Sequence, residues 1–156
     1  MLLSTRLVQR IEDHAEELTR GVVQDLQSNP KTPSYHALPS QTIQRRAYDV
    51  VRNLGKWLTT MSDEEIESAH HELARRRAEE DIPLSELIYA LILTKYHLRN
   101  YISASGMVDS AVQLYQEQEL QHLIGRFFDK AAYYTVQGYE QAQRARRTEE
   151  EPAHRA

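Results

Sequence analysis

The chain has 156 residues, of which 40% are apolar and 27% charged, with no cysteine and a net charge of −4 at pH 7. Such a composition suits one soluble domain with a single core. It excludes disulfides, thiolate metal sites and a cysteine nucleophile, and it gives no bulk attraction to nucleic acid or to an anionic membrane.

The sequence predicts an all-α fold, because only five glycines and five prolines are available for turns. A first helix is expected over residues 3–26, ending before Asn29 and Pro30. A second should begin with Ser40 as its N-cap. The apolar stripes of these two helices are Leu7, Ile11, Leu18 and Val22, then Ile43, Ala47, Val50, Leu54, Trp57 and Met61.

A third, mostly polar helix is predicted from Ser62, which forms a capping box with Glu65 three residues later. Its apolar stripe is thin, with Ile66 and Leu73 flanking His70, so the helix should lie at the surface. The three consecutive arginines at 75–77 are interpreted as part of a solvated helix face.

The fourth helix lies in the segment DIPLSELIYALILTKYHLRNYI, where Pro83 suits the first turn. This segment is apolar on two faces, so we expect it to pack on two sides and to form the centre of the fold. Gly106 is the expected left-handed cap that ends it.

The last helix is predicted over residues 108–143 or beyond. Its 36 residues would make a rod of about 54 Å, longer than the roughly 30–35 Å of a compact domain of this size, so its end should overhang the bundle. We predict a domain at 1–143 and a charged, disordered tail at 144–156. The broad apolar face of the helix is the predicted interface of a homodimer, and it comprises Phe127, Phe128, Ala131, Tyr134, Gly138 and Tyr139.

Two Glu-x-x-His pairs have the spacing found in di-iron helical bundles: Glu67 with His70, and Glu119 with His122. That chemistry requires both members of each pair to project into the bundle. His122 shares a face with charged residues, so the second pair fails this requirement. We predict no metal, no cofactor and no catalytic residues, and a di-iron protein is only the second alternative.

The alternative hypothesis of a ligand sensor places a pocket beside the fourth helix. Lys95 falls on an apolar stripe, where a packed stem with a paired or exposed amine is the commonest arrangement. His97 could be a haem ligand, a proton switch or a hydrogen-bonded core histidine, the last being the most frequent case. Candidate walls for haem or a small ligand are Trp57, Tyr89, Lys95, Tyr96 and His97.

The centre of the chain also resembles a known family. The pattern is ELARRRAEEDIPLSELIYALILTKYHLRNYI, preceded by GKWL at 55–58 and followed by FFD at 127–129 and GYE at 138–140. It resembles the N-terminal sensor domain of RsbT co-antagonist proteins of the RsbR and RsbRD type, which is also found ahead of histidine kinases. The likeness covers residues 5–142.

The resemblance implies an all-helical domain, globin-like without haem in some members, that dimerises and passes a signal through its last helix. It supplies no catalytic residues. This sequence departs from the pattern because only a charged tail follows the last helix, with no output domain and no kinase. The chain is therefore either a stand-alone member or part of a longer protein.

We therefore expect a non-enzymatic regulatory or sensory domain of bacterial signal transduction, of the stressosome or histidine-kinase input type. It would act in the cytoplasm through homodimerisation and contact with a signalling partner, without nucleic acid and without membrane insertion, since no run reaches the roughly 18 apolar residues of a membrane span. The alternative is a globin-like sensor that binds haem or a small ligand.

Overall fold

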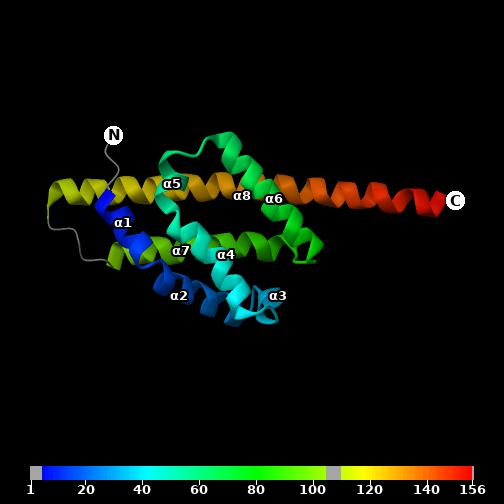
Figure 1. Ribbon diagram of the computed structural model, residues 1–156, viewed down its shortest axis with the longest axis horizontal. Coiled ribbons are helices and arrows are strands. Elements are labelled where there is room, and N and C mark those ends of the chain that lie inside the picture. The colour runs from blue at the N-terminus through cyan, green and yellow to red at the C-terminus, as the bar shows by residue number, and fades with distance from the viewer. Residues whose placement is uncertain (1–4, 105–109, 156) are drawn as a thin grey trace.

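The structure is a computed structural model that describes residues 5–104 and 110–155, with side chains described up to residue 150. Within these ranges the chain forms eight helices and no strand (Figure 1), which confirms the all-α prediction. Leu3, Gly106 and Val108, at which a helix start, a cap and a second helix start were predicted, lie outside the described residues.

The predicted first helix is two helices, α1 (Thr5–Asp13) and α2 (Ala15–Ser28). They meet at His14, whose φ of −106° and ψ of 20° leave the helical region. The predicted stripe is nevertheless buried along both helices. The break lets α1 pack against α4 and α5 while α2 packs against α4 and α7.

A short helix, α3 (Pro33–His36), lies in the proline-rich loop and leads to α4 (Ser40–Arg52). Ser40 does not cap α4; its hydroxyl instead donates a hydrogen bond to Oε1 of Gln27 at 3.0 Å. The predicted second helix is also interrupted, at Asn53, where α5 (Leu54–Thr59) begins.

The capping box that starts α6 (Asp63–Glu79) is confirmed, since the backbone N–H of Glu65 donates to Oγ of Ser62 at 3.2 Å. At its other end, the N–H of Ile82 bonds to the carbonyl of Arg77 across Asp81, which has a φ of 59°. This is the pattern of a Schellman cap with aspartate at the left-handed position. One face of the helix packs along α8, and the opposite face, with Arg75 and Arg76, is exposed, so α6 lies at the surface as predicted.

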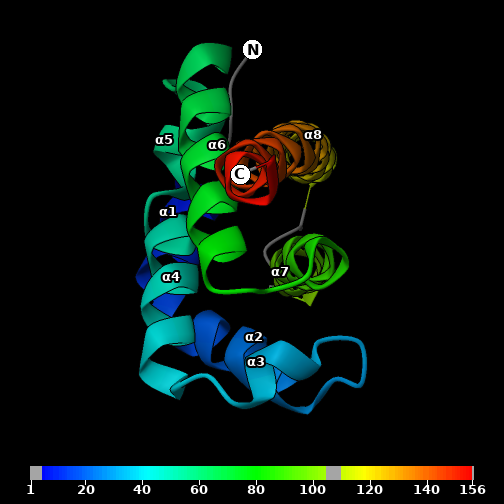
Figure 2. The same ribbon diagram turned by 90° about the vertical axis from the view of Figure 1, so that its right-hand side faces the viewer.

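The two longest helices, α7 (Leu84–Ala104) and α8 (Ala111–Arg155), run antiparallel along the long axis of the molecule (Figure 1). Viewed end-on, α7 lies between α2 and α8, as its two apolar faces predicted (Figure 2). A third face of α7 is open to solvent, with Tyr96 52% exposed.

The last helix extends well beyond the others (Figure 1). Its 45 residues correspond to about 67 Å at the usual rise per residue. It continues through the segment expected to be a disordered tail, so the charged end is helical; the domain boundary at residue 143 stays a prediction. Among the described helices, none has the length and apolar character required to cross a bilayer.

Candidate functional site

A small cavity of about 110 Å³ lies where α2, α4, α6, α7 and α8 meet beside Tyr35 of α3. Its wall is mostly aliphatic and aromatic, and the five helices contribute Val22, Ile43, Leu73, Leu87 and Phe128 in chain order. The polar side chains in the wall are Tyr35, Arg46, His70, Arg77 and Thr94. Apolar pockets with a few convergent polar groups are the usual form of a ligand site, and most of them are larger than this one, at about 300–1,000 Å³.

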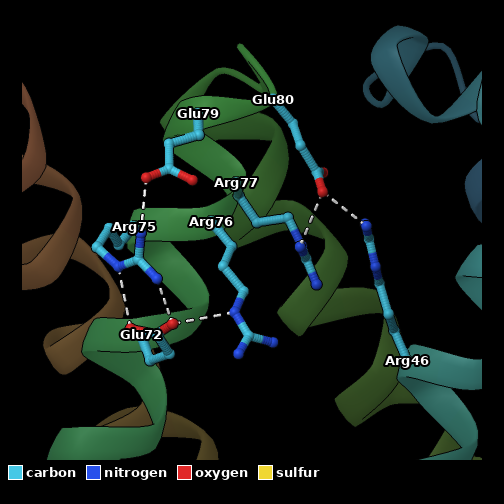
Figure 3. A network of polar contacts seen from close by, with 7 residues as sticks. All are labelled: Arg46, Glu72, Arg75, Arg76, Arg77, Glu79 and Glu80. Atoms are coloured by element: carbon cyan, nitrogen blue, oxygen red, sulfur yellow. Dashed lines mark hydrogen bonds and ion pairs between the residues drawn. The ribbon is translucent and has the colours of Figure 1, made fainter.

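Two arginines bring positive charge to this wall. Arg77 of α6 is only 6% exposed, and Arg46 of α4 approaches it from the opposite side. Oε1 of Glu80 accepts a hydrogen bond from each guanidinium, at 3.3 Å from Arg77 and 2.7 Å from Arg46 (Figure 3). Within the part of the chain that the structure describes, Nη1 of Arg46 is buried without a hydrogen-bond partner.

Burial, reinforced by the neighbouring charge of Arg46, lowers the pKa of Arg77. The guanidinium remains charged at neutral pH, because an arginine starts from so high a value. Two buried or half-buried cations thus share one carboxylate oxygen. An arrangement with more donors than acceptors has spare capacity for an anion.

Tyr35 completes the polar part of the wall. Burial raises the pKa of its hydroxyl to about 12, so the group is neutral at pH 7 and able to donate a hydrogen bond. Nearby, the buried carboxylate of Glu86 accepts from the backbone N–H and the hydroxyl of Ser34, both at 2.7 Å. Glu86 therefore ties α7 to α3, and both of its oxygens have donors.

The remaining arginines of the run at 75–77 form a separate surface cluster (Figure 3). Arg75 and Arg76 both donate to Glu72, and Arg75 also reaches Glu79 at 2.6 Å. Hydrogen bonds from Arg75 lower the pKa of Glu72 to about 2. A solvated face is thus confirmed for two of the arginines and wrong for Arg77, which falls on the buried side of α6 with Ile66, His70 and Ala74.

An aromatic cluster borders the cavity. Trp57 lies 5.7 Å from His70 and 5.3 Å from Phe127 between ring centroids, and His70 and Phe127 are 5.8 Å apart. Nδ1 of His70 is 2.8 Å from the carbonyl oxygen of Ile66, a position in which it donates. Burial lowers the pKa of His70, so the ring is neutral at pH 7.

The five predicted pocket residues are not brought together, and none of them lines the cavity. Trp57 belongs to the aromatic cluster, and the ring of Tyr89 lies under Nζ of Lys31 at 5.1 Å. The amine of Lys95 is 6.0 Å from the ring of Tyr96, which faces solvent.

His97 makes a specific contact that the sequence did not indicate. Its Nε2 lies 2.9 Å from Oδ2 of Asp25, joining α7 to α2, and both side chains are about one-third exposed. Of the predicted hydrogen-bonded core histidine, the hydrogen bond is present, but the side chain is not in the core. A Cβ on Gly21 would lie 3.4 Å from Nδ1 of the same ring, so α2 passes close to the imidazole.

The predicted dimer interface is largely internal. Phe127, Phe128, Ala131, Gly138 and Tyr139 are buried within the chain, and Tyr134 is half-buried. The hydroxyl of Tyr139 donates to the carbonyl of Ile82 at 2.7 Å. The assignment of this face to a second copy is therefore corrected: α6 and the cavity occupy it. The large apolar side chains of α8 that do face solvent are Val112, Leu114, Tyr115 and Tyr133.

Neither Glu-x-x-His pair is arranged as a metal site. His70 bonds to the backbone of its own helix, and His122 is exposed. Across the described ranges, no three side chains of the metal-ligating types lie close enough to hold an ion.

The fold is an all-α domain in which the longest helix forms part of the cavity wall. The chain belongs to the family described as the RsbT co-antagonist protein rsbRD N-terminal domain, whose model matches residues 15–153. This confirms the resemblance that the sequence indicated. The family is regulatory rather than catalytic. Comparison with curated proteins gave no match, and neither did comparison with solved structures, so a globin-like arrangement stays a prediction.

Proposed function

We propose that this chain is a non-enzymatic sensory domain of bacterial signal transduction, in which the state of the cavity is passed to a signalling partner through α8. The input would be of the stressosome or histidine-kinase type, in the cytoplasm. Family membership supports the regulatory role. The position of α8, in the cavity wall and beyond the bundle, supports the route through this helix.

One observation carries the proposal: α8 forms part of the cavity wall and also extends beyond the bundle. Phe127 and Phe128 line the cavity, and the same helix continues to Arg155 (Figure 1). A continuous helix transmits a displacement along its axis, because its packed side chains and backbone hydrogen bonds resist local deformation. A change in the cavity wall would therefore move the protruding end.

Polar contacts make α6 the partner of α8 in such a movement. Lys130 bonds to Asp63 at 2.8 Å near one end of α6, and Arg146 donates to the carbonyl of Ala78 at 3.0 Å near the other. Between them, Gln137 bonds to His71 at 2.8 Å. The two helices are thus joined along the whole of α6, and α6 also supplies His70 and Arg77 to the cavity.

Homodimerisation is part of the proposal, with a different surface from the one first predicted. The exposed apolar side chains on α8 form a surface that a second copy could bury. Tyr133 is 63% exposed, and Val112 and Tyr115 are each 67% exposed. A second copy is the expected occupant, because the family resemblance implies dimers and the originally predicted face is taken up within the chain.

Binding to the signalling partner provides the test. Isothermal titration calorimetry would measure association of the full chain with a purified STAS-domain protein and, separately, with a purified histidine kinase from the same organism. A variant ending at residue 143 should lose most of this affinity, and its circular dichroism should fall by no more than the deleted helical residues account for. An exposed substitution at the opposite end of the fold, Arg10→Gln, serves as the matched control. Equal affinity in all three chains would contradict transmission through the end of α8.

A further inference from the structure

We propose that the cavity is a binding site for a small monocarboxylate with a short apolar tail, held by Arg46 and Arg77. The inference deepens the proposed function by naming the ligand class. Binding itself can be measured whether or not the chain signals, so the two proposals can fail separately.

The size and lining of the cavity limit the ligand to a short apolar tail. A cavity of about 150 Å³ lined by aliphatic and aromatic groups accommodates benzene. The present volume of about 110 Å³ is somewhat smaller, with Leu87, Leu91 and Phe128 among its walls. A branched or linear chain of about four or five carbons fits this space. Haem is several times larger than the cavity.

The two arginines favour a carboxylate as the head group of the ligand. Arg46 and Arg77 both belong to the cavity wall, and the guanidinium of each donates to the same oxygen of Glu80. Nη1 of Arg46 is buried and has no acceptor within the described residues. An apolar occupant would give the guanidinium of Arg46 no further acceptor, a neutral oxygen would give a weak one, and an anion would give the strongest. The planar fork of a guanidinium matches the two oxygens of a carboxylate.

The neighbouring carboxylates do not occupy all the hydrogen-bond donors of the two arginines. Glu80 is the carboxylate that both arginines share, and Glu86, the other acid near Tyr35, already accepts two hydrogen bonds from Ser34. The neutral hydroxyl of Tyr35 adds a third donor to the cavity wall. Inorganic phosphate would meet the donors but leave the apolar part unfilled, and a metal cation would be repelled by the two arginines. A short-chain carboxylate would pair with the donors and also fill the apolar part of the cavity.

Calorimetric titration of the full chain with sodium isovalerate, with 3-methylbutan-1-ol and with inorganic phosphate tests the assignment. Isovalerate should bind, and the alcohol, which has the same tail without charge, should bind about tenfold more weakly or worse, as expected for loss of a charge-assisted hydrogen bond. Phosphate should be weaker than isovalerate. The class is overturned if isovalerate fails to bind at millimolar concentration, or if the alcohol or phosphate binds as tightly.

Variants locate the site. Arg46→Gln should weaken isovalerate about tenfold, whereas Arg45→Gln, the same change at the exposed neighbouring position of α4, should not. Ala90→Leu, which places a larger side chain in the cavity wall, should abolish binding while the chain remains folded by circular dichroism. Equal affinities for isovalerate in the Arg46 and Arg45 variants, or undiminished binding in Ala90→Leu, would overturn the proposal.

Discussion

Gly138 of α8 lies against the backbone of His71 in α6. A Cβ built on Gly138 would stand 2.7 Å from the Cα of His71 and 3.1 Å from its carbonyl oxygen. Backbone atoms cannot rotate away as a side chain can, so even a methyl group here would push the two helices apart. The absence of a side chain at residue 138 therefore sets how closely α6 and α8 approach.

Replacing Gly138 by alanine should lower the free energy of unfolding by about 1–3 kcal/mol, the usual cost of overpacking. Gly125→Ala in the same helix is the matched control. A Cβ there meets nothing within 4 Å, so alanine should add about 0.5–1 kcal/mol through its better helix propensity. Urea denaturation measures both variants, and a change of the same sign in the two would refute the close-approach argument.

Substitutions at Phe127 and Tyr133 should distinguish an effect on folding from an effect on self-association. Phe127 is 4% exposed and contacts Trp57 and His70, so Phe127→Ala should cost about 3–5 kcal/mol of stability. Tyr133→Ala removes an exposed ring and should change stability by less than about 0.5 kcal/mol. We expect it to reduce dimer formation in light scattering. A wild-type chain that is monomeric at all concentrations would exclude the dimer.

The sequence predicted the class of fold and the family because both depend on long apolar stripes and on a few residues that end helices. The capping box at Ser62 was found for the same reason. The breaks at His14 and Asn53 were missed, since an interruption of one residue leaves the apolar spacing nearly unchanged. Local patterns therefore located the buried faces better than the ends of the helices.

The candidate site was less predictable. Arg77 lies eleven residues after Ile66, which places it on the buried face of α6, but its charge and its two arginine neighbours argued for solvent. A stripe shows that a face is apolar without showing what covers it. The face around Gly138 and Tyr139 was therefore assigned to a second copy, although α6 of the same chain covers it.

Stability should fall in mild acid because of His70. Its folded-state pKa is lowered from 6.5, chiefly by burial, so the unfolded chain takes up the proton at a higher pH. The contribution of the neutral His70 ring to the free energy of unfolding is therefore fully present above pH 6.5. It is lost as the pH falls below 6.5 toward the folded-state pKa. Thermal unfolding at several pH values between about 7.5 and 5 should show a weaker dependence in His70→Leu. The exposed His122→Gln should match the wild type, and three identical profiles would contradict a buried neutral imidazole.

The cap of α6 contains a backbone conformation that aspartate adopts at a cost. Asp81 has a φ of 59°, in the left-handed region that glycine occupies without penalty. Asp81→Gly should therefore raise the free energy of unfolding by about 0.5–1 kcal/mol. The contact of Asp81 with Arg146, 3.4 Å long and exposed, is too weak to reverse this gain.

Asp81→Ala provides the contrast, because alanine loses the same carboxylate but keeps the Cβ, and it should be destabilising. Differential scanning calorimetry decides the matter: if glycine is no better than alanine, the strain at residue 81 is negligible and the carboxylate is what holds the cap.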